Sequence, residues 1–164
     1  MTSSPPYQTD AHHYFSTECS DQMWTLIDIP ERTRAQEEQM IALAWSSFWH
    51  WSQRKDFQPK HKSAAYWQLA RVFSLVANKE KVAEEFAQQC IELSEEKRLP
   101  PLYKGYGYES LARVKLLQQD FSAATEAMSR ARNFSNAIEN PHEKAFLDKE
   151  LKDLEHLMNT HSNL

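Results

Sequence analysis

The stretch Leu69-Ala70-Arg71-Val72 recurs 42 residues later as Leu111-Ala112-Arg113-Val114. Tyr66 and Tyr108 stand at the same offset. Beyond the next turn the register shifts by one residue, a change that surface turns tolerate. Because small and apolar residues keep three-to-four spacing in both stretches, each is predicted to be a pair of helices. With the shift, three positions match on each second helix: Ala83, Ala87 and Cys90 correspond to Ala124, Met128 and Ala131.

This pattern resembles the tetratricopeptide repeat, in which an A helix and a B helix of about 34 residues cross at small residues. The later of the two matching helix pairs carries the resemblance. It has Leu111-Ala112 on its first helix and Ala124, Met128 and Ala131 on its second. Here the period is about 42, alanine replaces glycine at the crossing, and the late proline of the pattern is absent. Covering roughly residues 63–135, the resemblance implies antiparallel helix pairs stacked into a superhelix. The chain also resembles uncharacterised bacterial proteins with such pairs.

Composition points to the same fold class. Only two of the 164 residues are glycine, whereas helix formers such as Glu, Gln, Ala, Leu and Lys are abundant. A net charge of −4 without a basic stripe argues against nucleic-acid binding. The sequence has no apolar run of the roughly 18 residues that a membrane span needs, and residues 1–10 do not resemble a signal peptide. These features predict an all-α, soluble, cytoplasmic protein that binds neither nucleic acid nor membrane.

Turn signals divide the chain into about seven helices. Thr33 and Gln36 form a capping-box pattern, Pro59 suits a first helical turn, and Asp120 is a predicted N-cap. A helix pair cannot bury its apolar face alone, so neighbouring pairs are expected to stack. We expect an N-terminal tail and one domain of stacked pairs, divided as follows: tail 1–9, degenerate first pair 10–57, second pair 58–98, third pair 100–136, capping helix 140–160.

The tetratricopeptide resemblance implies a concave groove lined by the first helix of each pair. Carrying that register over assigns partner-binding roles to Trp67, Arg71, Tyr106, Glu109 and Arg113. The two arginines, one repeat apart, suit an acidic segment or a C-terminal carboxylate, and the aromatic rings suit a contact surface. The alternative is that both arginines are solvated or paired with Glu109 and neighbouring acids.

Aromatic residues are dense in the N-terminal third. Helical spacing places Trp45, Phe48 and Trp51 on one face, which predicts that they belong to the core. Trp49 and His50 point elsewhere, so they are candidates for the border of a pocket or for a dimer interface. Core or partial burial is the alternative.

A metal or catalytic site has weaker support. His12, His13, Glu18, Cys19 and His50 lie on two helices that are expected to pair, but they form no recognised metal or catalytic motif. The sequence therefore predicts no catalytic, cofactor-binding or metal-binding residue, and no cofactor. The two glycines, Gly105 and Gly107, are expected to let the first or the second helix of the second pair approach closely, because no phosphate-loop pattern surrounds them.

Three hypotheses for function remain. The first is a non-enzymatic adaptor that binds a protein or peptide in the groove. The two arginines of the groove favour an acidic ligand. This hypothesis predicts that changing both Arg71 and Arg113 to Glu abolishes partner capture and leaves the fold intact. The second is a homodimeric structural protein that associates through its aromatic N-terminal helices. The third is a small-molecule or metal-dependent enzyme built near the first two helices. The sequence leaves open whether the capping helix or the N-terminal tail fills the groove.

Overall fold

The computed structural model describes residues 6–162, and side chains within 11–160. Every regular element in this range is an α-helix, which confirms the predicted all-α class and the expected number of helices. The seven helices are α1 (Pro6–Ile27), α2 (Arg34–Ser52), α3 (Pro59–Phe73), α4 (Glu80–Glu96), α5 (Pro101–Leu117), α6 (Phe121–Asn136) and α7 (Pro141–Ser162).

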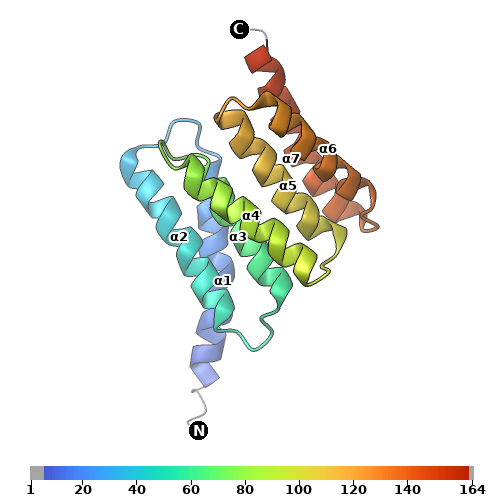
Figure 1. The fold of residues 1–164 in the computed structure, drawn as a ribbon. Coiled ribbons are helices and arrows are strands. Elements are labelled where there is room, and N and C mark those ends of the chain that lie inside the picture. Colours follow the sequence, from blue (N-terminus) through green and yellow to red (C-terminus); the bar gives the residue numbers. More distant parts are fainter. Residues whose placement is uncertain (1–5, 163–164) are drawn as a thin grey trace.

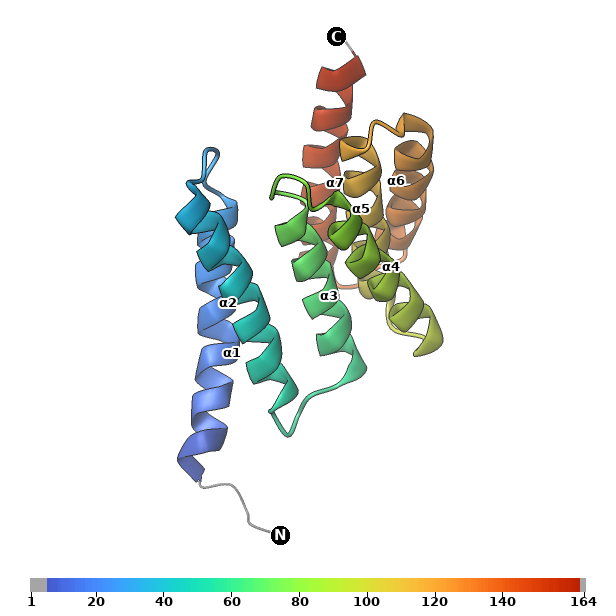
Figure 2. The same cartoon turned by 60° about the vertical axis from the view of Figure 1, so that its left-hand side comes forward.

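The helices stack in sequence as antiparallel pairs (Figure 1). Helix α1 pairs with α2, α3 with α4, and α5 with α6, while α2 packs on α3 and α4 packs on α5. Helix α3 also contacts α5, so two first helices of successive pairs are direct neighbours. The last helix, α7, packs against both α5 and α6 and lies behind them in Figure 1. A second view shows the same order, with α1 and α2 at one side and α7 beside α5 at the other (Figure 2).

The predicted helix starts are confirmed at atomic detail. Thr33 and Gln36 form the reciprocal capping box at the start of α2, and Asp120 accepts a hydrogen bond from the amide of Ala123 at the start of α6. The side chain of Asn140 accepts from the amides of His142 and Glu143 at the start of α7. Each of these side chains satisfies backbone donors that a helix terminus leaves free.

Two features of the helix ends differ from the sequence-based expectation. Helix α1 begins at Pro6 rather than near Asp10, because a proline at the first helical position costs no hydrogen bond. The start of α3 carries an unpredicted reciprocal cap in which the amide of Gln58 donates to Nδ1 of His61 at 3.0 Å. In the turn that follows α3, Asn78 has a φ of 59°, which lies in the left-handed region.

Two apolar clusters form the core. One cluster contains residues of the four helices α1, α2, α3 and α4. The other contains residues of α5, α6 and α7 together with the later part of α4. The predicted apolar face of α7 is fully buried at Leu147, Leu151 and Leu154. The alanines at the helix crossings are also buried, which brings the paired helices close together: Ala83, Ala87, Ala112, Ala124 and Ala131 are all inaccessible to solvent.

The glycines of α5 lie where neighbouring helices approach closely. A Cβ on Gly107 would lie 2.6 Å from Cγ1 of Ile91 and 3.0 Å from the backbone nitrogen of that residue in α4. A Cβ on Gly105 would instead collide with the side chain of Leu147 in α7. The expected approach of a helix from the second pair is therefore confirmed at Gly107, where α4 approaches, and wrong at Gly105, where α7 approaches instead.

The predicted core position of Trp45 is wrong, because 43% of this residue is exposed. The face of α2 that packs on α1 is formed instead by Met40, Ala44 and Ser47, which are all buried. Small side chains are favoured there because α1 and α2 pack closely. Within the residues that the structure describes, no helix is both long enough and apolar enough to cross a bilayer.

Candidate functional site

The five residues assigned to the groove lie together where α3 meets α5. Nε1 of Trp67 donates to Oε2 of Glu109 at 3.0 Å, and Nε of Arg113 donates to the other carboxylate oxygen at 3.0 Å. The rings of Trp67 and Tyr106 stack with centroids 4.2 Å apart. Arg71 lies one helical turn after Trp67 on the same face of α3, as does Arg113 after Glu109 on α5.

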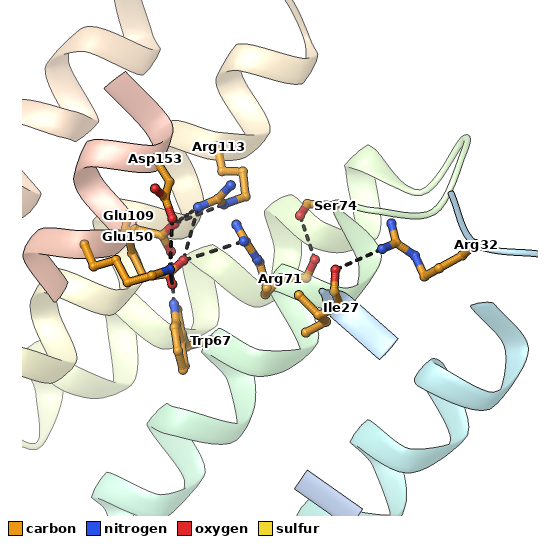
Figure 3. Close-up of polar contacts among 10 residues, drawn as sticks. Ile27, Arg32, Trp67, Arg71, Ser74, Glu109, Arg113, Glu150 and Asp153 are labelled. Carbon is orange, nitrogen blue, oxygen red and sulfur yellow. Dashed lines mark hydrogen bonds and ion pairs between the residues drawn. The ribbon is translucent and has the colours of Figure 1, made fainter. Parts of the chain in front are cut away.

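Helix α7 completes this cluster with a carboxylate that the sequence analysis did not assign. Glu150 lies 3.6 Å from Nη2 of Arg71 and 3.5 Å from Nη2 of Arg113. Figure 3 shows the two arginines facing Glu109 and Glu150 between the three helices. Two guanidinium groups and two carboxylates therefore form one charge network, which is the pairing considered as the alternative to ligand binding.

Burial is uneven across the network. Glu109 is 1% exposed, Trp67 3% and Arg113 7%, so these three groups have little contact with solvent. The side chain of Arg71 keeps 14% of its surface exposed. Its Nε and Nη1 atoms are buried without a hydrogen-bond partner. Arg71 is thus the member of the network with donors to spare.

Burial also changes the acidity of this site. Removal from water raises the pKa of Glu109 to about 7, because the charged carboxylate is poorly solvated there. The positive charge of Arg71 lowers this pKa, and the negative charge of Glu150 raises it further. Burial likewise raises the pKa of Tyr106, so its hydroxyl stays protonated at neutral pH. Glu109 and Tyr106 are therefore both weaker acids in this site than they are in water.

An aromatic cluster runs beside the charge network, with one ring from each odd-numbered helix. Trp67 of α3 contacts Trp24 of α1 at 5.3 Å, Tyr106 of α5 at 4.2 Å and Phe146 of α7 at 5.8 Å, measured between ring centroids. Phe146 is 40% exposed, and Trp24 is half-buried. The four rings therefore form a partly open strip along the inner face, which we define as the face shared by α1, α3, α5 and α7.

Side chains of α7 lie against the region where α3 meets α5, in which the groove was expected. Phe146 packs on the aromatic pair, and Glu150, one helical turn later, receives the two arginines. The sequence analysis missed both residues. Their four-residue spacing beside the apolar face of α7 was the signal that could have identified them.

A cavity of about 450 Å³ lies beside Arg113 and is lined by residues of the turn after α3, of α5 and the turn that follows it, of α6 and of α7. Its lining is mainly apolar and includes one buried cation. Three of the side chains that line it are large, apolar and more than one-third exposed: Leu117, Phe121 and Leu157.

The N-terminal helices bring together only part of the considered metal site. Nδ1 of His12 lies 2.9 Å from Nδ1 of His50, whereas His13 is exposed and Glu18 accepts a hydrogen bond from Gln22. No group of three or more His, Cys, Asp or Glu side chains in the described part of the chain is placed to hold a metal ion. The surrounding surface is aromatic, with Tyr14, Phe15 and Trp49 exposed by 57%, 43% and 55%.

The comparisons with protein-family models, curated proteins and solved structures gave no match. The inner face, the cavity and the N-terminal aromatic surface are therefore interpreted from their own geometry.

Proposed function

We propose that this chain is a non-enzymatic adaptor of the tetratricopeptide type, in which the inner face binds an extended acidic segment of another protein. The observation that carries the proposal is the aromatic strip, to which α1, α3, α5 and α7 each contribute one ring. Trp24, Tyr106 and Phe146 keep exposed surface, whereas Trp67 is buried and supports them from within. Three partly exposed rings from alternate helices suit an extended chain, which can contact them one after another. Aromatic side chains supply much of the binding energy in such contacts.

The charge next to this strip favours an acidic ligand. Arg71 borders the rings and has two buried nitrogen atoms without an acceptor. Because these atoms are buried, the partly exposed Arg71 side chain would turn toward a ligand carboxylate to use them. The charge-assisted hydrogen bonds then formed are stronger than those between neutral groups. Nε and Nη2 of the deeper Arg113 are already engaged by Glu109 and Glu150, so on the inner face Arg113 would orient Arg71 through the shared Glu150 rather than contact the peptide.

Binding in this proposal leaves α7 in place. Displacing α7 would expose Leu147, Leu151 and Leu154, each of which contributes about 2 kcal/mol or more through burial. A cost of this size exceeds what a short peptide contact offsets. The ligand would therefore lie beside α7, along Trp24, Arg71 and the exposed edge of Phe146.

This geometry also changes the choice of variant. Converting both Arg71 and Arg113 to Glu would place four carboxylates in one buried cluster, so the expectation that the double variant leaves the fold intact is not retained. Arg71→Gln is the cleaner change because Glu150 keeps Arg113 as its partner. Arg34→Gln on α2 is the matched control, since its side chain is 91% exposed and lies away from the inner face.

The test is selection of peptides from a displayed random library on the wild-type protein, followed by calorimetry of the enriched peptides. Enrichment of acidic peptides, with binding weakened about tenfold or more by Arg71→Gln and unchanged by Arg34→Gln, supports the proposal. Binding that is equal in all three proteins, or enrichment of basic peptides, contradicts it.

A second candidate function is homodimer formation through α1 and α2. It is favoured by the exposure of Tyr14, Phe15 and Trp49 on one aromatic surface, since exposed apolar patches mark contact sites. Light scattering over a range of protein concentrations tests it, with Trp49→Glu as the variant. A dimer that Trp49→Glu dissociates supports this candidate, and a monomer at every concentration rules it out.

A further inference from the structure

The cavity beside Arg113 has the size and lining of a small-molecule site. Its volume of 450 Å³ falls within the range of about 300–1,000 Å³ that is typical of such sites. Leu75 and Leu116 form its deeper apolar wall, and Leu117, Phe121 and Leu157 form its rim. The rim side chains come from α5, α6 and α7, so the cavity exists only where these helices meet.

Three polar residues enter this apolar lining. Arg113 is 7% exposed and is the one charged residue among the described residues that line the cavity. Ser74 and Gln119 supply the other polar groups. A guanidinium has only donors, so the polar end of a ligand here must accept hydrogen bonds. The absence of any acidic side chain from this described lining favours a negatively charged acceptor.

We propose that this cavity binds a medium-chain aliphatic monocarboxylate, with its chain between Leu75, Leu116 and Phe121 and its carboxylate toward Arg113. The aliphatic chain matches the walls, which contain one aromatic ring and four leucines and offer no stacked rings for a flat ligand. The carboxylate would contact Nη1 of Arg113, which takes no part in the contacts with Glu109 and Glu150. This site is separate from the aromatic strip, so the inference does not depend on peptide binding at the inner face.

Proton uptake at Glu109 would assist the anion. Both nitrogen atoms of Arg113 that contact Glu109 are committed to that carboxylate while it is ionised. Burial holds the pKa of Glu109 near 7, so a proton can enter the network when a second carboxylate arrives. Glu150 faces both arginines and also lies 3.8 Å from Nζ of Lys149, which forms an ion pair with Asp153 at 3.1 Å. These groups complete the charged surroundings.

The probes are octanoate, decanoate, decan-1-ol and decylamine, measured by isothermal titration calorimetry on the full chain at pH 7.5. Decanoate is expected to bind about 15-fold more tightly than octanoate, because each buried methylene contributes about fourfold in affinity. It is also expected to bind about tenfold or more tightly than decylamine, which places a cation beside Arg113. Equal binding of decanoate and decylamine, or no decanoate binding at millimolar concentration, overturns the proposal.

Variants locate the site without disturbing the core. Phe121→Gln and Leu157→Gln change rim side chains that are 41% and 40% exposed, so both proteins should fold. Each should weaken decanoate binding about fivefold or more. Phe15→Gln is the matched control on α1, with 43% exposure and no part in the cavity. Loss of binding in Phe15→Gln with retention in the two rim variants would assign decanoate to the N-terminal aromatic surface and contradict the proposal.

Discussion

The indole nitrogen of Trp67 donates a 3.0 Å hydrogen bond to the carboxylate of Glu109, and so links α3 to α5 inside the protein. Because the same carboxylate also accepts from Arg113, one buried acid holds side chains from two helix pairs. Arg71 and Glu150 extend this link to α7. The network thereby fixes the spacing of the inner face on which the proposed peptide binding depends.

Loss of the indole donor should destabilise the protein. In Trp67→Phe the ring still packs on Tyr106, but Oε2 of Glu109 loses its donor while remaining buried. An unsatisfied buried acceptor costs about 1–3 kcal/mol in unfolding free energy. Urea denaturation checks this value, with Trp49→Phe as the control because Trp49 is 55% exposed. Equal stability of the two variants would contradict the role of the hydrogen bond.

The acidity of Glu109 predicts a pH effect on stability. Its pKa is about 7 in the folded protein and is raised from an ordinary value of 4.5. The stabilisation from this group is therefore complete below about pH 4.5 and is lost as the pH rises through 7, with a limiting slope of about 1.4 kcal/mol per pH unit.

The comparison with Glu109→Gln isolates this effect. Burial lowers the pKa values of His50 and His61, so those groups make stability rise with pH in the same range. Both histidines are present in the variant, and their contribution cancels in the difference. The wild-type free energy of unfolding, measured from pH 5 to pH 7.5, should fall relative to that of Glu109→Gln. Parallel curves would contradict the raised pKa.

Helix α7 is predicted to be part of the core rather than a detachable arm. Leu151 is fully buried, so Leu151→Ala should reduce the free energy of unfolding by about 2–5 kcal/mol. Leu157 lies two turns further on and is 40% exposed, so Leu157→Ala should cost less than about 1 kcal/mol. Chemical denaturation of both variants measures the difference. A small cost at both positions would show that α7 contributes little to folding.

The glycines of α5 should differ in their tolerance of a methyl group. Gly107→Ala brings a Cβ to within 3.0 Å of the α4 backbone at Ile91, and backbone cannot rotate away. We expect a net loss of about 1–3 kcal/mol despite the better helix propensity of alanine. Gly105→Ala meets the end of the Leu147 side chain, which can adjust, so its loss should be smaller. Thermal unfolding ranks the two variants, and the reverse order would contradict this contact geometry.

Local signals in the sequence were sufficient to predict where the helices lie. Caps such as Thr33 and Asp120 and the prolines at first turns act within a few residues, so their outcome depends little on the rest of the fold. The apolar face of α7 was likewise predictable, because helical periodicity is a local property. Trp45 was misplaced because the closeness of α1 and α2 selected small residues for the contact face.

The composition of the candidate site depended on a helix distant in sequence. The repeat spacing of Arg71 and Arg113 predicted that both arginines lie on the same face of the protein. No residue close to them in the sequence indicated that Glu150 would approach both. That contact follows from how α7 packs on α5, which is a tertiary event. The cavity rim has the same origin, since its residues belong to the ends of three helices.

The most direct test of the proposed inner face is site-specific photo-crosslinking in the native cells. A benzophenone amino acid at Phe146 places the probe on the aromatic strip, and the same probe at Trp49 samples the N-terminal aromatic surface; both residues are exposed aromatic positions. The proposal predicts a protein adduct from position 146 that Arg71→Gln weakens, and none from position 49. An adduct from position 49 alone, or one from position 146 that Arg71→Gln leaves unchanged, would contradict it.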